Sequence, residues 1–126
     1  MSVLDASALL ALLNAEEGAD AVAKHVASGR AVVSSVNYAE VASKLSDHGL
    51  PEEAIREALE SLGLRVIAFS ESHALTCGLL RRSTREAGLS LGDRACLTLA
   101  LQEKLPAVTA DRRWQGVTDI PLEVVR

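Results

Sequence analysis

Two kinds of apolar pattern alternate along the chain. Short runs rich in β-branched residues are separated by longer stretches in which apolar residues recur every three or four positions. The first pattern is typical of buried strands and the second of amphipathic helices. The expected strands lie at residues 3–4, 31–34, 65–69, 107–109 and 122–125. The expected helices lie at residues 7–14, 18–27, 37–47, 51–62, 71–87 and 93–104.

This alternation defines the fold class that we expect. Strands separated by helices favour an α/β domain, because each crossing helix returns the chain so that successive strands run in the same direction. We predict a three-layer α/β/α domain with a mostly parallel, five-stranded sheet, and we expect residues 1–126 to form a single domain. Sites in such folds form beyond the carboxyl ends of the strands, so the residues that follow each strand are the candidates for chemistry.

Acidic residues stand at several of these strand ends. Asp5 follows the first strand, Glu40 lies shortly after the second, and Asp111 follows the fourth. Another acid, Asp93, begins the last predicted helix, at the top of a stripe of apolar residues. Because such a stripe docks on the sheet, we expect Asp93 to point inward, towards the strand ends.

Each acid also has an ordinary structural interpretation. Asp is a preferred helix N-cap, so Asp5, Asp93 and Asp111 can each cap a helix at a gain of ~1 kcal/mol. Glu40 precedes Lys44 by one helical turn, the favourable order for an exposed helix pair that contributes ~0.3 kcal/mol. Composition and spacing alone leave both interpretations open for all four acids.

The composition and charge narrow the classes of protein. Apolar residues make up 48% of the chain and charged residues 24%, as in globular domains. Aromatic residues make up only 2%, so no row of rings is available on which single-stranded bases would stack. The net charge is −4, so the molecule as a whole has no positive field that attracts nucleic acid.

Nothing in the sequence indicates a membrane or secretion. No apolar stretch approaches the ~20 residues of a membrane span, and the early run "SALLALL" is short and lacks a basic flank, so we expect no signal peptide. Cys77 and Cys96 are isolated, as is typical of buried, reduced thiols. We therefore expect a cytoplasmic protein.

Three segments carry the acids in a recognisable order. "VLDASALLALL" holds Asp5 and Ser7, "SSVNYAEVASKL" holds Glu40, and "LSLGDRACLTLALQEKLPAVTADRRW" holds Asp93 and Asp111. In order and spacing these segments, which span nearly the whole chain, resemble the PIN-domain endoribonucleases, and most closely the VapC-type toxins of type II toxin–antitoxin pairs. The resemblance implies a metal-dependent enzyme that hydrolyses RNA.

The same resemblance implies a role for each acid. Asp5 and Asp93 would bind the metal directly, Asp111 would bind through water or hold a second ion, and Glu40 would orient a water molecule. Oxygen ligands without His or Cys suit Mg²⁺ or Mn²⁺. Because clustered carboxylates repel one another, at least one of them should have a raised pKa.

Polar and basic residues near the acids are candidates for contact with the substrate. Ser7 can hydrogen-bond a carboxylate or the scissile phosphate, and Asn37 can assist, although both also fit ordinary helix caps. Arg94 and Arg112, with Arg113, neighbour the acids in sequence and can contact RNA phosphates. The alternative is a solvated surface, or a pairing of Arg94 with one of the acids.

The resemblance also implies partners. The family works as homodimers and binds a cognate antitoxin, so we expect both for this chain, with RNA as the substrate. A further acid, Asp119, lies nearer the last strand and is assigned no role.

Two other functions remain open. A receiver-like signalling domain is also acidic and α/β, but it requires paired acids after the first strand, where this chain has only Asp5. It also requires a phospho-accepting Asp after the third strand, where this chain has Ser70. A PIN-like domain that has lost catalysis and acts only by binding is the third alternative.

Overall fold

A parallel sheet forms the centre of the molecule. The computed structural model describes residues 1–117 and 119–126. The sheet has five strands in the order β3-β2-β1-β4-β5, and every neighbouring pair is parallel. The strands are β1 (Ser2–Leu4), β2 (Ala31–Ser34), β3 (Arg65–Ile67), β4 (Ala107–Thr109) and β5 (Leu122–Val124). The predicted α/β fold with a five-stranded sheet is confirmed.

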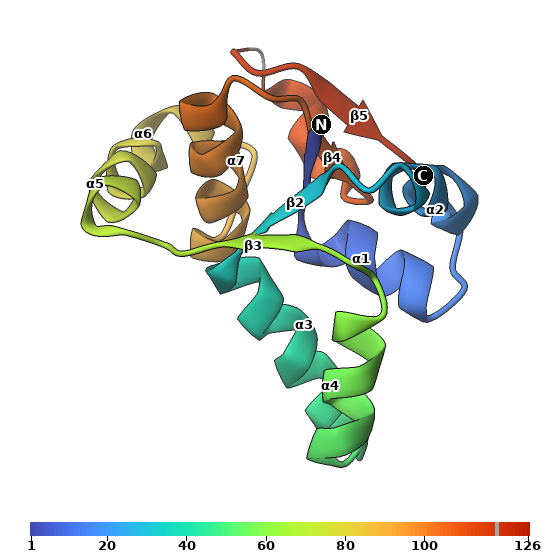
Figure 1. Ribbon diagram of the computed structural model, residues 1–126. Coiled ribbons are helices and arrows are strands. Elements are labelled where there is room, and N and C mark those ends of the chain that lie inside the picture. Colours follow the sequence, from blue (N-terminus) through green and yellow to red (C-terminus); the bar gives the residue numbers. More distant parts are fainter. Residues whose placement is uncertain (118) are drawn as a thin grey trace.

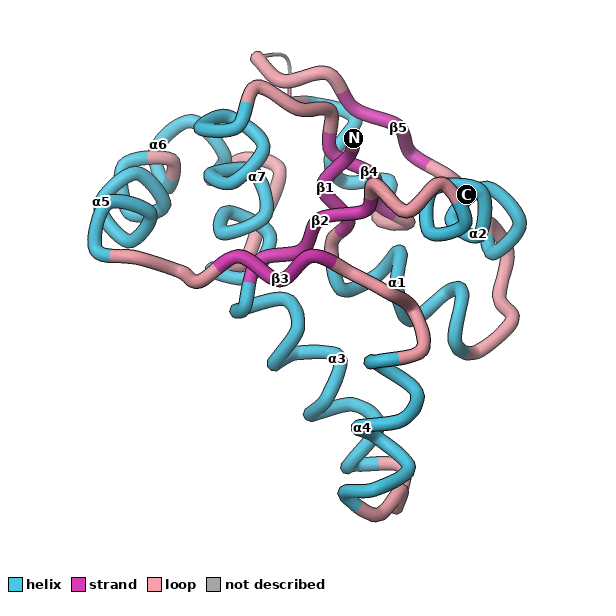
Figure 2. The backbone as a smooth tube through the Cα atoms, viewed as in Figure 1, coloured by secondary structure: helices cyan, strands magenta, loops and turns pink. Residues whose placement is uncertain are grey.

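Helices cover both faces of this sheet. The described helices are α1 (Ala6–Leu13), α2 (Ala19–Ala27), α3 (Ser35–Asp47), α4 (Glu52–Glu60), α5 (Glu71–Leu79), α6 (Arg81–Thr84), α7 (Leu91–Glu103) and the 3₁₀ helix η1 (Arg112–Gly116). Figure 1 shows α5, α6 and α7 on one side of the strands, with α1, α3 and α4 on the other. The strands lie between these two groups of helices (Figure 2). In the part of the chain that the structure describes, no helix is both long and apolar enough to cross a membrane.

The core is divided into two by the sheet. Val3 and Val32 pack with α7 and the buried Trp114 on one face. Their neighbours Leu4 and Val33 pack with α1, α2, α3 and α4 on the other face. Successive strand residues point to opposite faces, and both faces are covered, which explains why the strands are continuous apolar runs.

The bounds of several predicted helices differ from the observed ones. The helix expected at residues 37–47 begins two residues earlier, at Ser35, because Ser34 is its N-cap. The expected helix at residues 71–87 divides at Leu80 into α5 and α6. The last long helix begins at Leu91, because Ser90 is its N-cap and Asp93 lies in its first turn. Ser90 Oγ accepts from the Asp93 N–H, while Asp93 Oδ2 accepts from the Ser90 N–H. This reciprocal capping box fixes the start of α7 two residues earlier than expected.

The strand order brings distant segments to one edge of the sheet. β1 lies between β2 and β4, and the strands are parallel, so their carboxyl ends share an edge. α1 begins one residue after β1, α3 begins directly after β2, and η1 follows β4 after a two-residue connection. The acids that follow these strands are therefore neighbours in space.

Candidate functional site

Asp5 is buried at the end of the central strand. It caps α1, with Oδ1 accepting the Ala8 N–H at 2.8 Å. Thr109 Oγ1 donates to Asp5 Oδ2 at 2.6 Å, and Ser7 Oγ lies 2.8 and 2.9 Å from the two carboxylate oxygens. Only 2% of Asp5 is exposed. Burial raises the pKa of Asp5 to about 6 against these hydrogen bonds, and the charge of Asp93 adds a smaller rise. The sequence predicted that repulsion among the carboxylates would raise the pKa of at least one acid, whereas the main cause of the raised pKa of Asp5 is its burial away from solvent.

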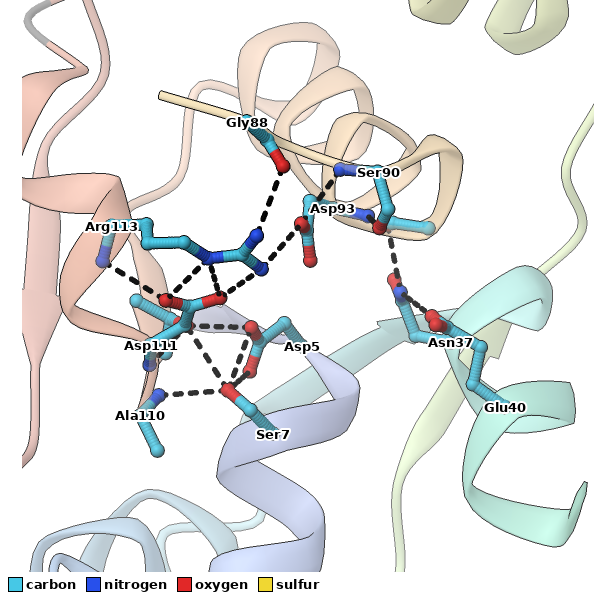
Figure 3. Close-up of polar contacts among 12 residues, drawn as sticks. Asp5, Ser7, Asn37, Glu40, Gly88, Ser90, Asp93, Ala110, Asp111 and Arg113 are labelled. Carbon is cyan, nitrogen blue, oxygen red and sulfur yellow. Dashed lines mark hydrogen bonds and ion pairs between the residues drawn. The ribbon is translucent and has the colours of Figure 1, made fainter. Parts of the chain in front are cut away.

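Two hydroxyls join Asp5 to the segment that carries Asp111. Ser7 Oγ accepts the Ala110 N–H at 2.9 Å, and Thr109 Oγ1 accepts the Asp111 N–H at 3.0 Å. The sequence predicted that Ser7 would hydrogen-bond either a carboxylate or the scissile phosphate, and in the structure it hydrogen-bonds the carboxylate of Asp5. Figure 3 shows Asp5, Ser7 and Asp111 gathered at this junction. The ends of β1 and β4 are fixed relative to each other by side chains as well as by the sheet.

Glu40 reaches the start of α7 from the opposite side. Asn37 is buried, and its Nδ2 donates to Glu40 Oε1 at 2.7 Å and to the Gly92 carbonyl at 2.9 Å. A Cβ at Gly92 would overlap the Glu40 carboxylate. Burial raises the pKa of Glu40, the Asn37 hydrogen bond opposes that rise, and the charge of Asp93 adds to it. Among the ion pairs of the described residues none joins Glu40 to Lys44, so Glu40 is not part of a simple exposed helix pair.

Asp93 and Asp111 share a cation from the chain itself. Arg113 Nη2 lies 2.6 Å from Asp111 Oδ2 and 3.6 Å from Asp93 Oδ2. Arg113 therefore lowers the pKa of Asp111. Asp111 also caps η1 through the Arg113 N–H. Asp5 and Asp111 are helix N-caps, as their structural interpretation predicted. Asp93 instead lies in the first turn of α7, as the second member of a capping box whose N-cap is Ser90.

The predicted basic residues are placed differently from one another. Arg94 Nη1 donates to the Cys77 carbonyl of α5 at 2.9 Å, so its guanidinium is directed to that helix and not to an acid. Arg112 is exposed, and its Nε donates to the Arg126 carbonyl at 3.2 Å. An open hollow beside Arg112 is lined by Ser7, Glu17, Ala110, Asp111, Arg112 and Arg126. Arg113, not Arg94, is the arginine at the acids.

Asp119 lies elsewhere in the molecule. It lines a hollow with the C-terminal end of α7 and Pro121, whereas Asp93 lies in the first turn of the same helix. Asp119 and Asp93 thus lie near opposite ends of α7.

Sequence reasoning did not identify Thr109 and Gly92 as parts of the site. Thr109 is the last residue of β4, which pairs with the central strand β1. A hydroxyl residue at that strand end was the sequence signal that could have identified it. Gly92 carries no such signal. A side chain is excluded there only because α3 brings Glu40 against α7, and the sequence does not show that contact. Within the described residues, no three His, Cys, Asp or Glu side chains are arranged as they would be around a metal ion.

Comparison with known families decides the classification. The model of the PIN domain family matches residues 2–120. The chain belongs to the PIN domain family. No curated protein is similar enough to add a closer relative.

Several solved structures share the fold. A toxin–antitoxin complex from Klebsiella pneumoniae has a TM-score of 0.76 at 19% identity, covering 100% of this PIN domain and 98% of that chain. DNA-bound VapBC from Salmonella typhimurium has a TM-score of 0.74 at 19% identity, covering 99% and 98%. VapBC-1 from nontypeable Haemophilus influenzae has a TM-score of 0.71 at 20% identity, covering 98% and 96%. At these identities the likeness shows a common fold.

Proposed function

We propose that this PIN domain is a Mg²⁺- or Mn²⁺-dependent endoribonuclease and the toxin of a VapBC-type toxin–antitoxin pair. One observation carries the proposal. Asp93, in the first turn of α7, and Asp111, after β4, share a single cation in the Arg113 guanidinium, and the charge of Asp93 acts on both Asp5 and Glu40. A position at which carboxylates already hold one cation is suited to bind a different cation, such as a metal ion.

The donor set fits a hard divalent ion. The four acids offer only carboxylate oxygens, which Mg²⁺ and Mn²⁺ prefer, and the Arg113 guanidinium is a stand-in for positive charge between two of them. Asp5 and Asp93 would hold the ion, with Asp111 as a further ligand, directly or through water. When bound, the ion would act as a Lewis acid on the scissile phosphate and make water a better nucleophile.

The chain's own residues would orient the reacting groups. Ser7 and Thr109 fix the Asp5 carboxylate, so it need not reorganise when a ligand arrives. Asn37 holds Glu40 against α7, and the raised pKa of Glu40 suits it to accept a proton from an attacking water. Arg112, beside the open hollow next to Asp111, is positioned to contact an RNA phosphate.

Cleavage of labelled RNA by the purified protein tests this proposal. Asp5→Asn and Asp93→Asn should each reduce Mn²⁺-dependent cleavage by about 100-fold or more, because each removes a charge on which the ion depends. A chelator should abolish cleavage by the wild type. Asp20→Asn makes the same chemical change at an exposed acid on α2 and should leave the rate unchanged.

Two results would contradict this proposal, the first its active site and the second its enzymatic role. Cleavage that survives both substitutions comes from a contaminant or from another site. No cleavage by the wild type on any RNA, despite Mn²⁺ binding, favours a PIN-like binding domain. A receiver-like domain would instead be phosphorylated by a small phosphodonor.

We further propose that the protein pairs with an antitoxin and forms a homodimer. Several chains of the same fold come from toxin–antitoxin or VapBC structures. Leu75 and Leu79, one turn apart on α5, are largely exposed, and apolar groups of this kind mark contact surfaces. Expression of the chain alone should arrest bacterial growth, and co-expression of a small reading frame next to its gene should restore it. Light scattering of the purified chain tests the dimer.

A further inference from the structure

The cation at the acids is tied to three separate segments. Arg113 Nε lies 3.1 and 3.0 Å from the two carboxylate oxygens of Asp111. Its Nη1 donates to the Gly88 carbonyl at 3.0 Å, and its Nη2 faces both Asp111 and Asp93. Figure 3 shows this guanidinium spanning the space between η1 and the first turn of α7. One side chain thus contacts two carboxylates held at different helix starts.

The contacts of Arg113 are unequal in length and in solvent exposure. The ion pair with Asp111 measures 2.6 Å, whereas that with Asp93 measures 3.6 Å. The Arg113 side chain is 55% exposed, against 16% for Asp93 and 21% for Asp111. The guanidinium therefore reaches the acids from the solvent side, and the contact with Asp93 is the weaker of the two.

The backbone that carries Arg113 is firmly held. The next residue, Trp114, is fully buried in the core on the α7 face of the sheet, and Asp111 caps the N-terminal end of η1. The position of η1 is therefore held by contacts other than those of the Arg113 side chain as well.

We propose that Arg113 is a resident counter-cation, a positioning residue that competes with a divalent ion for Asp93 and Asp111. The inference rests on the proposed metal site. Without the ion, the guanidinium neutralises two carboxylates that would otherwise repel each other. A divalent ion that uses Asp93 must share that carboxylate with the guanidinium or displace it. Arg113 thus keeps the acids in place while lowering the affinity of the site for the ion.

Calorimetric titration with Mn²⁺ alone, without RNA, tests this competition. Arg113→Gln should bind Mn²⁺ about five- to tenfold more tightly than the wild type, since it loses a competing charge-assisted contact. Arg112→Gln removes the same charge from the adjacent residue, which has no ion pair with Asp93 among the described contacts. Its affinity should stay within about twofold of the wild type, which separates a contact effect from net charge.

A second variant keeps the test decisive if Arg113→Gln does not fold. Arg113→Lys retains the charge, but a lysine ammonium lacks the planar fork that spans Gly88, Asp93 and Asp111. Its Mn²⁺ affinity should fall between those of the wild type and Arg113→Gln. The fluorescence of the single tryptophan, Trp114, reports whether η1 stays packed in each variant.

The outcomes separate this inference from the proposed function. If the wild type binds Mn²⁺ and the Arg113 variants bind it no more tightly than Arg112→Gln, Arg113 does not compete and the inference is wrong. If Arg113→Gln binds Mn²⁺ more weakly, Arg113 supports the ion, which also overturns it. If neither the wild type nor any variant binds Mn²⁺, the proposed metal site itself fails.

Discussion

At the scale of a single residue, the burial of Asp5 makes stability depend on pH. Its pKa is about 6 in the folded protein, against 3.8 for an unburied Asp. Between these two values the folded state keeps a proton that the unfolded state has lost, so the free energy of unfolding falls as the pH rises through this window. Above pH 6, where Asp5 is ionised in both states, its burial lowers the free energy of unfolding by about 3 kcal/mol for a pKa shift of this size.

Asp5→Asn should therefore stabilise the protein at neutral pH while removing its activity. An amide carries no charge to desolvate, but it loses part of the hydrogen bonding to Ser7 and Thr109, which costs about 1 kcal/mol. We expect a net gain of about 1–2 kcal/mol at pH 7–8 that disappears below pH 4. Urea denaturation of both proteins across this range measures the difference. A difference that does not change with pH would contradict the ionised, buried state of Asp5.

At the scale of elements, the contact between α3 and the first turn of α7 depends on a glycine. Gly92 lies where a Cβ would overlap the Glu40 carboxylate, while its carbonyl accepts from Asn37. Gly92→Ala should move Glu40 aside, because a carboxylate at the end of a flexible side chain yields more easily than backbone. RNA cleavage should fall about 10-fold or more, as expected when a group that handles protons is displaced, while stability changes by less than about 1 kcal/mol.

A second glycine provides the control for this change. Gly78 lies in α5, and a Cβ there would meet nothing within 4 Å. Gly78→Ala should raise the free energy of unfolding by about 0.5–1 kcal/mol, since alanine loses less backbone freedom in a helix, and it should leave cleavage unchanged. Equal activity of Gly92→Ala and the wild type would mean that the position of Glu40 is unimportant.

The strands and most helices could be predicted from the sequence because each has its own pattern of apolar residues. The five β-branched runs became the five strands, since a strand buried on both faces needs a continuous apolar run. The break at Leu80 was not readable, because an apolar pattern continues through it. The start of α7 was misplaced because Ser90 and Asp93 both fit a cap, and only the capping box distinguishes them.

The sequence predicted those site residues whose place follows from their position relative to a strand or helix. Asp5 and Asp111 follow strands, so parallel strand ends were enough to bring them together. Arg94 and Arg113 both neighbour acids in sequence, yet only Arg113 contacts them. The direction of a long side chain depends on neighbouring elements: α5 offers a carbonyl to Arg94, whereas the loop before α7 offers one to Arg113.

At the scale of the whole molecule, the acidic cluster exists only in the folded chain. Asp5 and Asp111 are brought together by the pairing of β1 with β4, and Glu40 meets the start of α7 across the sheet edge. An unfolded chain scatters these carboxylates and has little affinity for a single ion. Any ion that binds the cluster must therefore stabilise the fold by mass action.

Thermal unfolding with and without Mn²⁺ tests this coupling. At a free concentration of about 100 times Kd, the ion should add about 2.7 kcal/mol to the free energy of unfolding, which corresponds to a rise in Tm of roughly 10 °C for a domain of this size. A chelator should reverse the rise. Asp93→Asn, which retains the shape of the side chain but loses its charge, should reduce the rise to a few degrees. The same rise in both proteins would mean that Mn²⁺ binds outside the acidic cluster, because Asp93 is the acid whose charge acts on both Asp5 and Glu40.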